Sequence, residues 1–170
     1  MTTSNPHPSP SLNENEIESN AHQTNMPLQS QEKTMTPFIV TNKAEASTAF
    51  VKVRPFIGLS QIAVMADGIY GPERQFFFDK LTELVQTIET MPKTYETQDI
   101  EDPIVHLHYF MKDMNWHITE KDMEAQQLQA FGKADLGWGF PELGYISIEE
   151  LLANGAELDL HWTKKPLSQV

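Results

Sequence analysis

The aromatic residues of this chain are confined to one part of it. Fifteen of the sixteen Phe, Tyr and Trp residues lie from Phe50 onward, and only Phe38 precedes them. The earlier part consists mostly of Ser, Thr, Asn, Gln, Glu and Pro, which offer too little apolar surface to offset the entropy that a chain loses on ordering. We therefore predict a disordered, acidic and polar arm over residues 1–49 and a single folded domain over residues 50–170.

Acidic residues outnumber basic ones two to one. The 170 residues include 24 Asp and Glu against 12 Lys and Arg, and the formal net charge is −12. Such an acidic surface repels the phosphate backbone that dominates nucleic-acid affinity. Direct binding to nucleic acid is therefore not expected, and a basic protein is the partner that the charge favours.

Two absences narrow the possible classes of protein. The chain has no cysteine, which excludes disulfides, thiolate zinc sites, iron–sulfur clusters and cysteine nucleophiles. Its first residues have neither the basic nor the apolar region of a secretory signal, and its apolar stretches are shorter than the roughly 20 residues that span a bilayer. We expect a cytoplasmic protein with no membrane segment.

Helical periodicity appears in three places. Apolar residues recur at helical spacing over residues 57–66, on a face formed by Leu59, Ile62, Ala63 and Ala66, with Gly68 placed to end the helix. A longer amphipathic helix is predicted after Pro72 and before Pro92, with the apolar positions Phe77, Leu81, Leu84, Val85 and Ile88. Ser147 and Glu150 form a capping box that starts a short helix ending near Gly155.

Beyond Pro103 the pattern changes to the alternation that is typical of strands. Residues 105–110 and 116–120 alternate around a polar turn and predict a β-hairpin, and residues 129–136, 143–148 and 156–162 predict three more strands. The helices come mostly before the strands. The expected fold class is α+β, with a mostly antiparallel sheet of about four to five strands and two to three helices.

Three histidines form the candidate metal site. His106 and His108 share a face of the first hairpin strand, and His117 on the second strand could lie opposite them, with Glu120 or His161 as a further ligand. Histidines two apart also occur on the solvated face of a half-buried strand. The solvated face is the interpretation that we favour.

No catalytic residue is predicted. The acid pairs Glu120 with Asp122 and Glu157 with Asp159 carry little information in a chain with 24 acidic residues, and solvated edge positions explain them. The chain has no Gly-x-Ser-x-Gly elbow and no phosphate-binding loop. A non-enzymatic role without a cofactor is favoured over an enzymatic one.

A group of aromatic residues surrounds a glycine-rich turn. It comprises Phe131, Trp138, Phe140, Tyr145 and Trp162, and core packing would explain most of its members. If Trp138 and Phe140 are exposed at the tip, however, they form an anchor for a protein partner together with Tyr145. The nearby acids would then make a rim that steers toward a basic partner, namely Asp135, Glu142, Glu149 and Glu150.

The second half of the chain resembles a known family. The resemblance rests on residues 116–120, 130–137, 142–151 and 157–162. The block Glu-Leu-Gly-Tyr-Ile-Ser at 142–147 is the most specific of these. These runs resemble a bacterial domain-of-unknown-function family, number 2958, which is common on conjugative plasmids and integrative elements. The likeness covers about residues 103–167. It implies a bacterial host and a mobile genetic element, and it implies no activity.

Two hypotheses about function follow, and they belong to different classes. In the first, a non-enzymatic accessory protein binds a basic protein, such as a nucleic-acid-handling or host-defence protein, through its acidic and aromatic surface. In the second, a small metal-dependent enzyme uses His106, His108 and His117. A sheet edge that pairs with a copy of itself would make the protein a homo-oligomer, which is a third possibility.

Overall fold

Three α-helices precede the strands and a fourth lies between the last strands in the described part of the chain, which is residues 36–170 of the computed structural model. The elements in chain order are α1 (Lys43–Val53), η1 (Arg54–Phe56), α2 (Leu59–Gly68), α3 (Arg74–Thr90), β1 (Ile104–Val105), β2 (Leu107–Met111), β3 (Met114–Glu120), β4 (Ala130–Asp135), β5 (Glu142–Ile146), α4 (Ile148–Ala153), β6 (Glu157–Leu158), β7 (Lys165–Pro166) and η2 (Leu167–Gln169).

The main sheet has five strands in the order β5-β4-β3-β2-β6, and every pair in it is antiparallel. The hairpin of β2 and β3 sets His108 opposite His117, as the alternating pattern predicts. Strands β1 and β7 form a separate two-stranded antiparallel sheet. The predicted α+β class with a mostly antiparallel sheet is confirmed.

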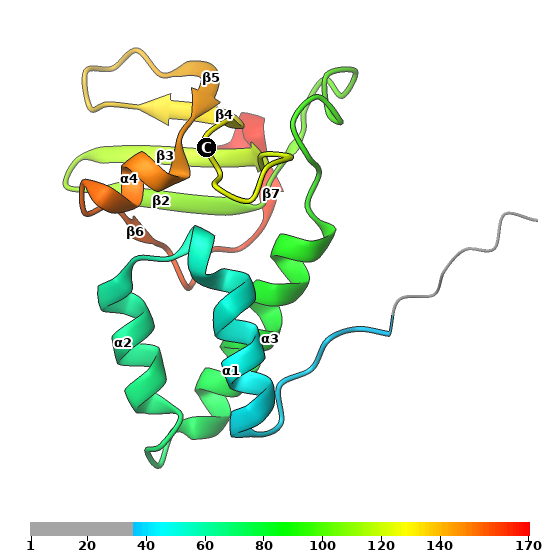
Figure 1. Cartoon of the computed structure of the whole chain (residues 1–170). Helices are drawn as coiled ribbons and strands as arrows, with labels where there is room; N and C mark the ends of the chain where they lie inside the picture. The colour runs from blue at the N-terminus through cyan, green and yellow to red at the C-terminus, as the bar shows by residue number, and fades with distance from the viewer. Residues whose placement is uncertain (1–35) are drawn as a thin grey trace, which may run out of the picture. The chain divides into compact units, whose positions relative to one another are not determined.

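The core lies between this sheet and the first three helices, which gather on one side of it (Figure 1). Inward-facing residues of the strands, such as Trp116 and Ile118, are buried together with Leu81 and Val85 of α3. The hydroxyl of Tyr109, which is fully buried, donates a hydrogen bond of 2.8 Å to the carbonyl oxygen of Phe56. This bond satisfies a polar atom that would otherwise be costly to bury, and it links the sheet to the helical layer.

The predicted start of the domain near residue 50 is wrong. Helix α1 begins at Lys43, where the side chain of Asn42 accepts hydrogen bonds from the N–H groups of Ala44 and Glu45. Ala46 and Ala49 on this helix are fully buried. Small side chains let α1 approach α3 closely, so residues 43–49, which include no aromatic residue, still contribute to the core. Of the predicted arm, residues 1–35 lie outside the described residues.

Two other elements differ from their predictions in detail. Helix α2 forms, but Met65 is its buried residue, whereas Leu59 of the predicted apolar face is 73% exposed. The helix ends at Gly68, as predicted, and the ring of Phe77 occupies the place that a β-carbon of this residue would take. The strand predicted at 156–162 is only β6, since Asp159 turns the chain by accepting a hydrogen bond from the N–H of His161.

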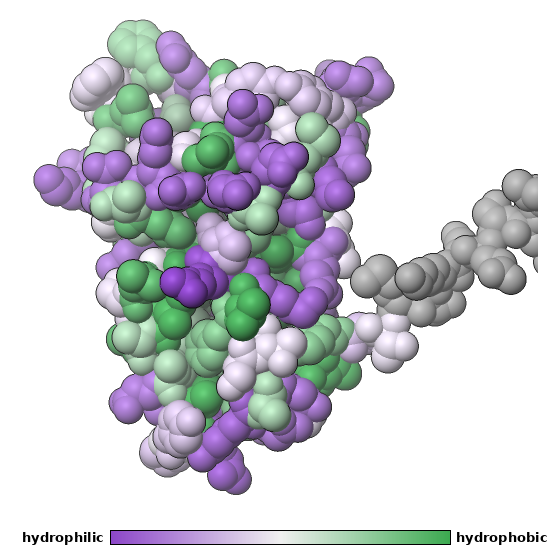
Figure 2. All heavy atoms as spheres, viewed as in Figure 1, coloured by the Kyte–Doolittle hydropathy of each residue, from purple (hydrophilic) through white to green (hydrophobic). Residues whose placement is uncertain are grey.

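The surface is predominantly polar on the face shown in Figure 2, where hydrophilic residues crowd the part that lies over the sheet. None of the described helices has the length and apolar character needed to cross a bilayer.

The described residues contain twenty acidic and eleven basic side chains, so their formal net charge is −9 with neutral histidines. The acidity therefore belongs to the folded part of the chain.

Candidate binding surface

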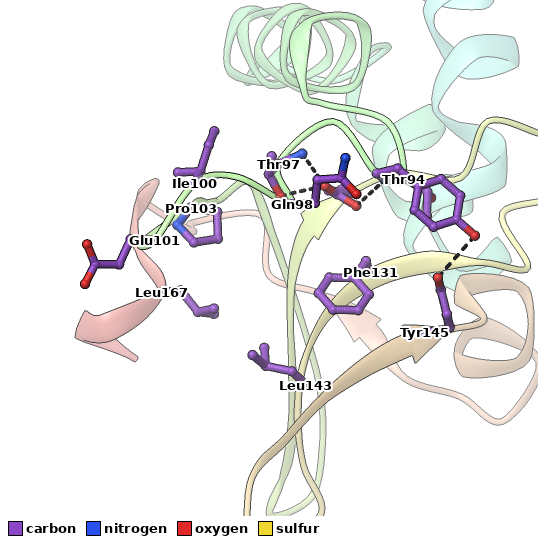
Figure 3. A pocket seen from close by; sticks show the side chains of 12 residues that line it. Thr94, Thr97, Gln98, Ile100, Glu101, Pro103, Phe131, Leu143, Tyr145 and Leu167 are labelled. Atoms are coloured by element: carbon purple, nitrogen blue, oxygen red, sulfur yellow. Dashed lines mark hydrogen bonds between the residues drawn. The ribbon is translucent and has the colours of Figure 1, made fainter.

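A groove of about 360 Å³ lies between the segment 94–103 and the outer face of strands β4 and β5 (Figure 3). One wall carries Ile100 and Pro103, and the other carries Leu143 and Tyr145, with Phe131 at the base. Most of these side chains are apolar. The groove therefore offers hydrophobic contact to a ligand or to a side chain of a partner.

Glu120 holds one wall of the groove in place. Its carboxylate accepts hydrogen bonds from the backbone N–H of Tyr95 at 2.9 Å and of Thr97 at 2.6 Å, and from the hydroxyl of Thr97 at 2.5 Å. The side chain is only 3% exposed. A shift of register after Ile118 places Glu120 opposite Phe131, and such bulges redirect side chains at functional surfaces.

The charge of Glu120 is not neutralised by a cation. All three of its hydrogen-bond donors are neutral, and no ion pair within residues 36–170 includes it. The residues that line the groove include a second acid, Glu101, and no Lys, Arg or His. The groove is therefore electronegative as well as apolar.

Two tyrosines meet at one end of the groove. The hydroxyl of Tyr145 donates to the hydroxyl of Tyr95 at 3.2 Å, and the two rings are 6.3 Å apart in an edge-to-face arrangement. This hydrogen bond raises the pKa of Tyr145 above its usual value. Tyr95 has a φ of 78°, which is unfavourable for a residue with a side chain. Such strain, held by the hydrogen bonds of Glu120, is common at functional sites.

The loop between β4 and β5 carries the exposed aromatic residues. Trp138 is 80% and Phe140 is 82% exposed, so the condition for a partner-binding anchor is met. Gly137 and Gly139 both have a φ of +79°, a conformation that glycine adopts without strain. Asp135 accepts a hydrogen bond of 2.9 Å from the N–H of Gly137. Local turn geometry therefore shapes the loop, while its aromatic rings remain outside the core.

The four acids predicted to form a rim around these aromatics belong to different elements. Asp135 and Glu142 flank the loop, at the end of β4 and the start of β5. Glu149 and Glu150 lie on α4, where Glu149 lines a separate open hollow with Arg54. Ile148, next to these two acids, is buried and anchors α4 in the core.

The histidines do not assemble into a metal site. The rings of His108 and His117 stack at 4.8 Å, but the nitrogens of His108 contact Asp159 at 3.1 Å and Asn115 at 3.0 Å. Trp162 packs against both rings. Within residues 36–170 no three His, Asp or Glu side chains are grouped as a metal ion requires. The predicted further ligand Glu120 is held in the groove wall instead.

His106 and His117 should make the stability of the protein depend on pH. Burial, aided by Lys164 near His106 and by His108 near His117, lowers the pKa of each ring from 6.5 to about 4. The unfolded chain therefore binds more protons than the folded one between these values. Stability should fall as the pH drops through this window, by about 2 kcal/mol for both rings after allowance for solvent screening.

Urea unfolding at pH 7 and pH 4.5 checks this expectation. The double variant His106→Gln and His117→Gln should lose most of the difference between the two conditions. The variant His161→Gln, at an exposed position, should retain it. An equal difference in all three proteins would show that other groups cause the dependence.

Sequence reasoning identified the exposed aromatics but missed the opposite wall of the groove. Tyr95 and Thr97 follow the helix break at Met91-Pro92, in a segment without periodicity that contains four acids, namely Glu96, Asp99, Glu101 and Asp102. That concentration of acids between a helix and a strand was the available signal. The partner of the segment, Glu120, is more than twenty residues away in the chain.

Comparison with known proteins gives one match. A family model described as "Protein of unknown function (DUF2958)" matches residues 79–166. This range runs from α3 to β7 and includes the β4–β5 loop and every residue that lines the groove except Leu167. Neither the curated proteins nor the solved structures yield a match.

Proposed function

The chain belongs to the DUF2958 family of proteins of unknown function, and from this premise we propose that it is a non-enzymatic interaction protein. It is an accessory protein of a bacterial mobile genetic element, acts in the cytoplasm, and binds a basic partner protein. The partner is a nucleic-acid-handling or host-defence protein. The contact surface consists of the β4–β5 loop, strand β5 and the groove beside it.

The single observation that carries this proposal is the exposure of Trp138 and Phe140. Two large aromatic rings, separated by one glycine, are each at least 80% exposed. Trp and Tyr are enriched among the residues that dominate the binding energy of protein interfaces. A single exposed apolar residue is common on protein surfaces, whereas a group of them marks an interaction site. Leu143 and Tyr145, on the strand that follows the loop, are exposed as well, at 59% and 57%.

The charge around this surface supports a basic partner. Residues 134–163 contain six acids and no Lys or Arg, and residues 94–111 contain four acids and no Lys or Arg. These two segments supply the β4–β5 loop and the facing wall of the groove. Opposite charge speeds association and suppresses wrong partners, and its effect weakens as salt rises.

Removing both anchors should abolish binding without affecting the fold. In the double variant Trp138→Ala and Phe140→Ala, we expect capture of the partner from a bacterial lysate to fall at least tenfold. The free energy of unfolding should change by less than about 0.5 kcal/mol, because exposed side chains contribute little to stability. Affinity capture at low and high salt, with quantification of each bound protein, is the measurement.

The matched control removes two exposed apolar side chains elsewhere. Leu59 and Val64 on α2 are 73% and 66% exposed, and the double variant Leu59→Ala and Val64→Ala should capture the same partner as the natural protein. The proposal fails if no protein is enriched at low salt, or if the Trp138 and Phe140 variant captures the same proteins in the same amounts.

A further inference from the structure

The two edges of the main sheet are treated differently. At the β6 edge, the side-chain amide of Gln61 accepts from the N–H of Leu158 at 3.0 Å and donates to its carbonyl oxygen at 2.9 Å. The outward backbone groups of that edge are therefore satisfied by the protein itself. At the other edge, β5 pairs with β4 alone among the strands of residues 36–170.

Strand β5 lacks most of the features that block edge pairing. Proteins usually protect an exposed edge with Lys, Pro, a bulge or a covering segment. Here Pro141 and Glu142 mark only the start of the strand, and its register with β4 is regular from Glu142 to Ile146. Four of its five residues are not buried. A further strand can therefore reach the backbone of residues 143–146.

The side chains beside this edge favour an extended apolar segment. Leu143 and Tyr145 are alternate residues, so they project from the same face of the sheet, and both line the groove (Figure 3). An added strand places every second side chain on this face, next to these two residues. Apolar residues at those positions would gain hydrophobic contact, while the strand itself gains backbone hydrogen bonds.

Charge favours a basic segment over a second copy of this protein. Glu142 is the first residue of β5, Asp135 is the last residue of the neighbouring strand β4, and Glu101 and Glu120 line the groove. Two β5 edges brought together would juxtapose these acids, which is destabilising. A segment with Lys or Arg at the positions between its apolar residues would instead meet opposite charge.

We propose that an extended segment of the partner protein, with alternating apolar and basic residues, adds to the sheet as a sixth strand along β5. This inference rests on the proposed function and names the mode of binding at the same surface. Backbone pairing supplies the affinity, contact with Leu143 and Tyr145 sets the register, and the acids select for positive charge.

A peptide of defined sequence tests the proposal on the full-length chain. The probe is the capped heptapeptide Lys-Val-Lys-Val-Lys-Val-Lys, titrated into the ¹⁵N-labelled protein at low salt. We expect chemical-shift changes centred on the amides of residues 142–146 and slower hydrogen exchange there. The peptide in which Glu replaces every Lys should bind at least tenfold more weakly.

Two N-methylated peptides separate strand pairing from simple charge attraction. An added strand directs the N–H groups of every second residue toward β5, so methylation of one alternate set should abolish binding and methylation of the other should preserve it. Equal binding by both peptides overturns the proposal, as do shift changes that lie away from β5. Protection, before peptide is added, of the β5 amides that do not pair with β4 also overturns it, because the edge would then be occupied already.

A pair of protein variants completes the test. Leu143→Ser should weaken peptide binding at least fivefold, and Leu59→Ser, at a similarly exposed leucine on α2, should leave it unchanged. If the peptides fail while lysate capture still depends on Trp138 and Phe140, the strand-addition inference is wrong and the proposed function stands. If that capture fails as well, both are wrong.

Discussion

Replacing Gly132 with alanine should destabilise the fold by about 3 kcal/mol, because the added methyl group has no room between the strands. A β-carbon at this position would lie 2.1 Å from the backbone oxygen of His117 and 3.0 Å from the α-carbon of Ile118. Both atoms belong to the backbone of β3, which cannot rotate away as a side chain can. Either the strands separate or the register of β4 changes, and both outcomes remove ladder hydrogen bonds. Urea unfolding of the purified variant is the measurement.

Gly144 provides the matched control for this substitution. It is the register partner of Gly132 on β5, and a β-carbon there would meet no atom within 4 Å. Gly144→Ala should therefore be neutral or stabilise the protein by up to about 1 kcal/mol, because alanine reduces the entropy of the unfolded chain. Similar unfolding midpoints for the two variants would contradict the steric explanation.

Glu120→Ala should cost about 3 kcal/mol and loosen one wall of the groove. The substitution leaves the N–H groups of Tyr95 and Thr97 and the hydroxyl of Thr97 without their acceptor, and hydrogen bonds to a charged group are the stronger kind. The strained φ of Tyr95 would then lose the contact that holds it. Hydrogen exchange should accelerate at the amides of Tyr95 and Thr97 before the neighbouring sheet is affected.

Two further variants show whether the loss of stability comes from the carboxylate of Glu120. Glu120→Gln keeps the length of the side chain but places an NH₂ group toward one of the donors, so its stability should be intermediate. Glu142→Ala removes an exposed carboxylate from the same sheet and should change the free energy of unfolding by less than about 0.5 kcal/mol. If Glu120→Ala behaves like Glu142→Ala, the carboxylate does not organise the segment 94–103.

The strands could be predicted because their pattern is local. In β2 and β3, alternation alone placed His108 and His117 on one face, and the turn between the strands set them opposite each other. Helix α1 could not be found in this way. Two of its three buried residues are alanines among Ser and Thr, and alanine becomes a core residue only when another helix packs against it.

The candidate surface divides along the same line. Trp138 and Phe140 could be selected from the sequence because glycines on either side of Trp138 keep the chain in a turn, where aromatic rings are easily left outside the core. The role of Glu120 could not be predicted in this way, since its three hydrogen-bond donors belong to a segment 23 to 25 residues earlier. The sequence did not decide whether the histidines bind a metal, because Asp159, the hydrogen-bond acceptor of His108, is 51 residues away.

The sequence by itself determined the α+β class, the hairpins, the acidic character and the glycine-rich aromatic loop, because each depends on residue types and spacings within a few positions of one another. Only the tertiary structure decided that α1 joins the core, that Asp159 and Asn115 hold His108 while Trp162 packs on His108 and His117, and that β5 is an open edge beside a groove. These features depend on which distant segments occupy the space around a side chain or a strand, and packing of the whole chain determines that occupancy.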